Sequence, residues 1–406
     1  MCSIKSMDIH KKLPVIYKVV IFIPIIIFLV FGNLRGTIWL LNDLCIMYML
    51  YISANVKIRY SKSLFFVGLF LLMCIIGNVF INGLYSITLI RIYDIFKGIV
   101  YLRFINYLTI NYKNQVMNFV SNDLFYFFNI YFIINIPIFL NQIKSNINRD
   151  NIAGMVGFHG THVVLLVWVL IIVINCAKLK ESEKITKIFL LLIFEFVFML
   201  ILGVFSDNTA FYFLGTFILI YSLSRIDKIS RLFTLRNISI IILSAIVIIN
   251  FIESNEKVKF YIDTKIKVKI EQYTNLHNDE IKSEERVEMI QYGLSNGNGF
   301  YFGKGIGIRY DIFGVRGKEY NEEPLHINMC DTSALIYEGG LIFAILVISL
   351  YYIQCININR NNKIFIFIIT VLFFCYAKLI SDEKMVFVFS LIQLALYYSY
   401  NINETN

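Results

Sequence analysis

Long apolar runs follow one another along most of the chain, separated by short polar connections. A helix needs about 20 apolar residues to cross the hydrocarbon core of a bilayer. The runs cover residues 15–31, 38–56, 63–81, 84–106, 118–140, 161–177, 188–205, 209–224, 237–253, 332–354, 364–380 and 385–400. They predict an all-α polytopic membrane protein with about twelve transmembrane helices. Arg91, Asp94 and Lys97 interrupt the fourth run.

One long hydrophilic segment, residues 254–331, divides the chain into three parts. Nine predicted spans precede it in residues 1–253, and three follow in residues 332–406. Within the segment, residues 278–299 carry apolar side chains near helical period, at Ile281, Val287, Ile290 and Leu294. This spacing predicts a short amphipathic helix lying on the membrane surface.

The composition agrees with a membrane protein. Of 406 residues, 58% are hydrophobic and only 16% are charged, and the mean hydropathy is +0.69. Soluble domains are about a quarter charged. The net charge of +9 reflects lysine-rich connections and does not predict a nucleic-acid partner. Most of the seven cysteines lie inside apolar runs without paired spacing, which predicts neither a disulfide framework nor a zinc site.

Lysine and arginine concentrate in alternate connections, those that precede the first span and follow the second, fourth, sixth, eighth and tenth. The opposite short connections hold only Arg35, Lys144, Arg149 and Lys384. Basic connections face the cytoplasm. The pattern therefore predicts that both termini are cytoplasmic and that residues 254–331 form a large external loop between spans 9 and 10.

Glycines cluster in the external segment, in "GFYFGKGIGIRYDIF" (residues 299–313), where Gly303, Gly305 and Gly307 surround Lys304. The spacing fits neither a phosphate-binding loop of the ATPase type nor a dinucleotide fingerprint. No ATP pool exists on the outer face. A loop in this position can instead contact a phosphate group that is carried on a lipid.

Titratable groups gather on the same predicted face. Four of the five histidines, His159, His162, His277 and His326, lie outside the membrane or at its boundary. Polar groups beside the hydrocarbon are costly unless they line a cavity, so their presence favours a functional site.

Four patches of sequence resemble one family. "RVEMIQYGLSNGNGFYFGKGIG" (286–307) resembles the segment of an arginine, a spacer and G-x-G in the large external loop of the O-antigen polymerase and O-antigen ligase superfamily. "HINMCDTSALIYEGGLI" (326–342) is similar to its His-Asn/Asp segment, and "GFHGTH" (157–162) and "SDNTA" (206–210) resemble two motifs on earlier outer turns.

Two features depart from the family pattern. The turn motif usually reads Ser-Arg-Thr where this chain has Asp207, Asn208 and Thr209, so its arginine is missing. The spacing from histidine to glycine is also about three residues longer than the common form. Asp331 therefore competes with His326 for the matched position.

The resemblance implies a metal-independent glycosyltransferase of the bacterial inner (plasma) membrane that uses undecaprenyl-diphosphate-linked oligosaccharide and needs no cofactor. It implies that Arg286 holds the departing diphosphate and that His326 takes the acceptor proton, with Asp331 orienting or replacing it. It further implies a substrate-binding set, namely Gly303, Lys304, Gly305, Gly307, Arg309, Arg316, His159, His162 and Asn208. The glycine backbone would offer N–H groups to the phosphate. A chain-length regulator and a flippase are candidate partners.

The favoured function is that of a repeat-unit polymerase for O-antigen or capsular polysaccharide. A ligase of the same superfamily shares these motifs and stays open. A flippase for the same lipid-linked sugars is an alternative from another class, although it would carry charges along many spans and only short outer loops. A secondary transporter for a small solute has less support, because no paired half-helices or internal repeat is present.

The predicted topology has a direct test at Glu256, just after the ninth span. A reporter enzyme that is active only outside the cytoplasm should be active when fused at this position, because the external loop begins there. Activity at this position of a second reporter, one that is active only in the cytoplasm, would overturn the topology.

Overall fold

The structure is a computed structural model. It describes residues 13–31, 37–54, 56, 60–145, 152–157, 160–181, 185–205, 209–226, 301–308, 330–376, 379–380 and 382–401, and a few isolated positions between 250 and 295. The predicted ninth span and the predicted amphipathic helix of residues 278–299 lie largely outside the described residues.

Every regular element in the described part of the chain is helical, which confirms the all-α class. The helices are α1 (Val15–Leu29), α2 (Thr37–Ser53), α3 (Ser61–Asn82), α4 (Ser86–Asn111), α5 (Lys113–Asn118), a π-helical turn η1 (Phe119–Leu124), α6 (Phe125–Lys144), η3 (Gly154–Val156), α7 (Thr161–Glu181), α8 (Ile185–Phe205), α9 (Thr209–Ser224), α13 (Asp331–Gly339), α14 (Leu341–Ile358), η8 (Arg360–Asn362), α15 (Lys363–Tyr376) and α16 (Glu383–Asn401).

Five of the described helical segments are long and apolar enough to cross a membrane, namely Ser61–Asn82, Lys113–Lys144, Thr161–Glu181, Thr186–Gly203 and Leu341–Ile358. Several others are apolar but shorter, including Val15–Leu29. α3 leaves large apolar side chains such as Phe65, Phe70 and Phe80 exposed. Exposed apolar side chains along such helices are what lipid contact requires, and they support a membrane protein.

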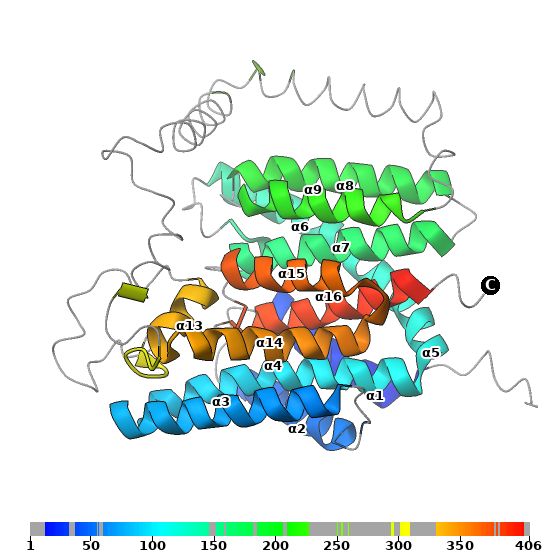
Figure 1. The fold of residues 1–406 in the computed structure, drawn as a ribbon. Helices are drawn as coiled ribbons and strands as arrows, with labels where there is room; N and C mark the ends of the chain where they lie inside the picture. Colours follow the sequence, from blue (N-terminus) through cyan, green and yellow to red (C-terminus); the bar gives the residue numbers. More distant parts are fainter. Residues whose placement is uncertain are drawn as a thin grey trace, which may run out of the picture.

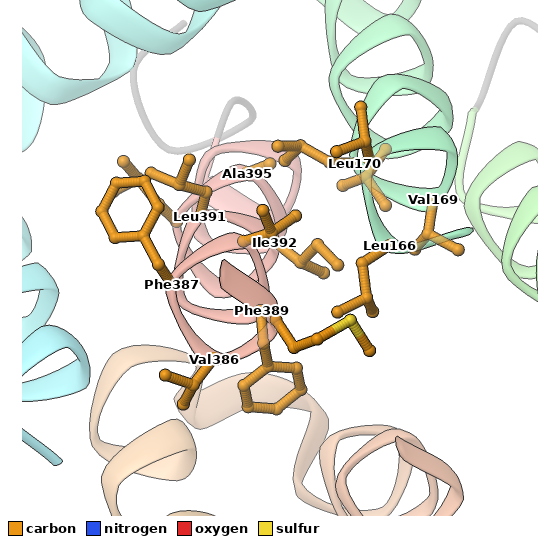
Figure 2. Packing of buried hydrophobic residues seen from close by; sticks show 14 of the residues in the cluster. Leu166, Val169, Leu170, Val386, Phe387, Phe389, Leu391, Ile392 and Ala395 are labelled. Carbon is orange, nitrogen blue, oxygen red and sulfur yellow. The ribbon is translucent and has the colours of Figure 1, made fainter. Parts of the chain in front are cut away.

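The centre of the bundle is the contact between α7 and α16. Nearly every side chain of α7 is buried, as expected for a helix that is apolar all round. Figure 2 shows Leu166 and Leu170 of α7 facing Ile392 of α16. α4 packs against the other side of α16 and also contacts α2 and α14. In Figure 1 the helices run side by side along one direction.

The predicted tenth span, residues 332–354, is two helices rather than one. α13 ends at Gly339, and α14 begins at Leu341. Gly340 between them has φ +89°, and a Cβ there would lie 2.7 Å from the carbonyl carbon of Tyr301. An L-residue tolerates neither the angle nor the contact. The expectation of one continuous helix was wrong because this break depends on a chain segment about 40 residues upstream.

Connections that the sequence places outside meet at one end of the bundle. Residues 301–308 contact the last turns of α3, the first turn of α4 and the end of α13. Asp331, the first residue of α13, accepts a hydrogen bond from the backbone N–H of Ile380, in the turn between α15 and α16. α13 lies at this end in Figure 1, opposite the C-terminal end of α16.

Connections that the sequence places inside meet at the other end. Lys180, at the end of α7, donates to the carbonyl of Ser399 at 3.1 Å. Arg225, after α9, donates to Asn362 at 2.6 Å. These contacts support the predicted alternation of the connections. The side of the membrane that each end faces still follows from the positive-inside rule alone.

Gly340 and Gly68 provide a matched pair of substitutions. Gly340→Ala should destabilise the protein by about 1–2 kcal/mol or more, since alanine disfavours a positive φ. Gly68→Ala, in α3, should be neutral or stabilising, because nothing lies within 4 Å of the added methyl group. Thermal unfolding of the detergent-solubilised protein measures both. Equal unfolding temperatures would contradict the described break.

Candidate functional site

The glycine-rich loop, residues 301–308, caps the end of α13. The backbone N–H of Lys304 donates to the carbonyl of Tyr337 at 2.8 Å, and that of Gly305 donates to the carbonyl of Glu338 at 2.9 Å. The last carbonyls of a helix have no partner within the helix. The loop supplies these partners, so the position of α13 and the position of the loop depend on each other.

Asn78 of α3 ties the same loop to the bundle. Its side-chain oxygen accepts from the backbone N–H of Ile306 at 3.0 Å. Its amide nitrogen donates to the carbonyls of Phe302 at 2.5 Å and of Glu338 at 3.2 Å. Thr88 of α4 donates to the carbonyl of Ile306 at 2.9 Å. The loop is therefore held by three separate helices.

Two of the glycines are required by close packing. Gly303 has φ +57° and Gly307 has φ +84°. A Cβ would lie 2.6 Å from the carbonyl carbon of Glu338 at the first position and 2.4 Å from the carbonyl oxygen of Ile87 at the second. The spacing of Gly303 and Gly307 is thus explained by the close approach of one backbone segment to another.

This geometry corrects one expectation about the loop. The backbone N–H groups of Lys304, Gly305, Ile306 and Ile308 all donate to acceptors within the protein. These N–H groups therefore do not fit the role of phosphate donors, while that role stays a prediction for the N–H groups of Gly303 and Gly307. The Lys304 side chain is half-buried, and its ammonium lies 5.7 Å from the centre of the Tyr337 ring. It remains the cationic group that this part of the loop offers.

A cluster of three fully buried charged residues lies beside the loop. The Nε of Arg91, in α4, donates to Oε2 of Glu338 at 2.8 Å, and its guanidinium lies 4.0 Å from Oδ1 of Asp331. The other oxygen of Asp331 accepts the N–H of Ile380 at 2.5 Å. Removing one member of a buried ion pair leaves an uncompensated charge and is strongly destabilising. We call Arg91, Asp331 and Glu338 the Arg91 cluster.

A second polar cluster lies further along α4. Lys97 pairs with Glu383 of α16 at 2.6 Å and with Asp94 at 3.1 Å. Tyr101 donates to Glu383 at 3.0 Å, and the amide of Asn42 donates to Tyr101 at 3.1 Å and also to Glu383. We call these residues the Lys97 cluster.

The two clusters share one face of α4. Residues 91, 94, 97 and 101 are spaced by three or four positions, which places them in one row along a helix. The row begins under the glycine loop and continues toward the middle of the bundle. The sequence signal for it was the charge that interrupts the fourth apolar run. Nothing local identified the partners Glu338 and Glu383, which lie far away along the chain.

The structure brings together part of the predicted site. Asp331 lies in the Arg91 cluster, one helix length from the loop that carries Gly303, Lys304, Gly305 and Gly307. Because Asp331 is buried and bonded to Ile380, its environment fits a positioning role better than that of the proton acceptor. The predicted residues Arg286, Arg309, Arg316, His326, His159 and Asn208 lie outside the described residues.

His162 belongs to a different part of the packing. It lies half-buried in the first turn of α7, a helix that packs mainly on α16, α9, α8 and α6. α13 packs instead on α14, α15 and α3. The described residues therefore do not place His162 in the Arg91 cluster.

The Arg91 cluster is testable through the balance of its charges. Arg91→Gln should lower the free energy of unfolding by about 3–5 kcal/mol, because two carboxylates lose a shared cation. Adding Glu338→Gln should restore part of that loss, since one carboxylate is then neutral. Thermal unfolding and size-exclusion profiles of the wild type, both single variants and the double variant measure this coupling. Strictly additive losses would show that the pair is not coupled.

Comparisons of the chain with protein-family models, with curated proteins and with solved structures find no match. The resemblance to the O-antigen polymerase and ligase superfamily therefore remains a prediction from four sequence patches. Any function assigned to the chain depends on those residues and on the geometry described above.

Proposed function

We propose that this protein polymerises lipid-linked oligosaccharide repeat units on the outer face of the bacterial inner membrane. In this reaction a sugar hydroxyl of one lipid-linked unit attacks the anomeric carbon of another. The C–O bond to undecaprenyl diphosphate breaks, a glycosidic bond forms, and the hydroxyl proton leaves with a base. The diphosphate departs with the bonding electrons.

One observation carries the proposal. The glycine loop and the helix that begins at Asp331, which represent two separate motif patches, are bonded to each other through Lys304, Gly305 and the last carbonyls of α13. A shared site requires such proximity, although 22 residues separate Ile308 from Asp331 along the chain. The contact supports the idea that the patches act together.

The chemistry needs two kinds of group. Positive charge must stabilise the departing diphosphate, and a base must take the acceptor proton. We assign the first role to Arg286, assisted by Lys304, Arg309 and Arg316, and the second to His326, whose imidazole is partly neutral near pH 7. Asp331, a member of the Arg91 cluster, positions the segment that carries His326. His159, His162 and Asn208 are proposed substrate contacts on other connections that the sequence predicts to be external.

A flippase for the same lipid-linked sugars is the second candidate. The observation in its favour is the number of charged residues inside the bundle, including Arg91, Lys97, Glu195 and Glu383. Arg91 pairs with Glu338, and Lys97 pairs with Glu383, in each case between packed helices. A carrier would present such charges to its substrate, so the pairing favours the enzyme.

The central prediction concerns Arg286 and His326. Arg286→Ala and His326→Ala should each reduce chain lengthening by about a hundred- to a thousandfold, the usual cost of losing one preorganised electrostatic contact. Protein levels should be unchanged. His277→Ala is the control, because it alters a histidine of the same external segment outside the motif patches. Normal long chains from either test variant would refute its assigned role.

The three candidate activities separate in one reconstitution. Purified protein in liposomes receives a lipid-linked repeat unit, without ATP or added metal. Ladders of oligomers support the polymerase. Transfer of the supplied unit to an added lipid A core, without ladders, indicates the ligase. Movement of the unit across the bilayer with no new glycosidic bond indicates the flippase.

A further inference from the structure

Glu195 is the middle residue of α8, and its side chain is fully buried. It lies away from the glycine loop and from both clusters on α4, and the proposed glycosyl transfer does not use it. α8 packs against α6, α7 and α9. Ionisable residues at the middle of apolar helices are costly and generally have a function.

Two buried asparagines surround Glu195. Asn175 of α7 donates its amide to Oε2 of Glu195 at 2.5 Å. Asn129 of α6 and Asn175 exchange amide hydrogen bonds of 3.1 and 3.2 Å, and Asn129 also donates to the carbonyl of Phe125 at 2.6 Å. All three side chains are buried. One carboxyl oxygen, Oε1, has no hydrogen-bond partner among the described residues.

No cation accompanies this carboxyl among the described residues. α9 contains no charged residue, and the lysine of α6, Lys144, is its last residue. On α7, Lys178 pairs with Glu181, and Lys180 donates to Ser399, both near the end of that helix. On α8 itself, Lys187 is exposed near the start. His162 is at the opposite end of α7 from these lysines. The amide of Asn175 is therefore the principal stabilising contact of Glu195.

A single amide donor does not offset the burial of a full negative charge. An isolated ionised carboxyl in an apolar medium costs far more free energy than a neutral acid, and such a group normally neutralises. A metal ion would need several free oxygen ligands. Here both asparagine oxygens already accept N–H groups of the opposite amide. The arrangement suits a proton on the free oxygen better than a metal ion.

We propose that Glu195, with Asn175 and Asn129, is a proton-binding site in the middle of the membrane. The proton sits on Oε1, while Oε2 accepts the Asn175 amide. The packing of α6, α7 and α8 then depends on one exchangeable proton, because loss of that proton leaves an ionised carboxyl between the helices. The inference is independent of the proposed polymerase function.

Dicyclohexylcarbodiimide tests the assignment in the intact membrane protein. This apolar reagent adds a protonated carboxyl across its N=C=N group: the acid proton moves to nitrogen, and the carboxyl oxygen bonds to carbon. The adduct rearranges to a stable N-acylurea, and no atom leaves. At neutral pH the peptide that contains Glu195 should gain the mass of one reagent molecule, and Glu195→Gln should lose this adduct.

Glu181 is the matched control, since this partly exposed carboxyl pairs with Lys178 and accepts a hydrogen bond from Tyr398. It should gain little adduct. Absence of the adduct at Glu195 would overturn the proposal. Protection of Glu195 by sodium or lithium ions at constant pH would also overturn it, in favour of a metal cation.

A second measurement tests the same assignment without the reagent. Glu195→Gln replaces a neutral acid by a neutral amide of similar shape and should leave the thermal unfolding temperature near that of the wild type at neutral pH. Glu195→Ala should lower it, because the Asn175 donor then has no partner at this position. An unfolding temperature of Glu195→Gln well above that of the wild type would show that the native side chain carries a costly charge, and one as low as that of Glu195→Ala would show that a neutral amide cannot replace the side chain; either result would overturn the proposal.

Discussion

The structure depends on one constraint: a charge buried among apolar helices must meet an opposite charge. Arg91 on α4 satisfies it through Glu338 and Asp331, at the two ends of α13. Because α13 then has a fixed place, its terminal carbonyls are presented to residues 301–308, which fold against them. The same rule fixes α16 through Lys97 and Glu383. Segments that are distant in sequence are thereby gathered at the end of the bundle that the charge pattern assigns to the exterior.

The glycine loop shows how packing and function can be confused in a sequence. Gly303 and Gly307 permit contact between backbones, and the loop's N–H groups bond Tyr337, Glu338 and Asn78. The loop is thus a rigid support. In the proposed reaction, side chains such as Lys304 and the proposed arginines supply the positive charge that holds the diphosphate. This division assigns anchoring to the loop backbone and the proposed substrate contact to cationic side chains.

Apolar runs were enough to predict the helices, because length and hydropathy are local properties. Each of the eleven predicted spans outside residues 237–253 coincides with one helix or, for residues 118–140 and 332–354, with consecutive helical elements. The break at Gly340 was not predictable, since it depends on Tyr301. For the site, Asp331 and the loop glycines were identified from motifs. Arg91 was visible only as an interruption of a span, because its partner Glu338 is 247 residues away.

The central claim is that the end of the bundle with the glycine loop faces the exterior. A membrane-impermeant maleimide tests it most directly, in a variant without native cysteines. Tyr301→Cys replaces an exposed residue of the loop, and Asn361→Cys replaces an exposed residue at the opposite end. In intact cells with a permeable outer envelope, the Tyr301→Cys variant should be labelled. The Asn361→Cys variant should be labelled only after the inner membrane is permeabilised. The reverse result would place the loop in the cytoplasm and contradict a role in glycan transfer outside the membrane.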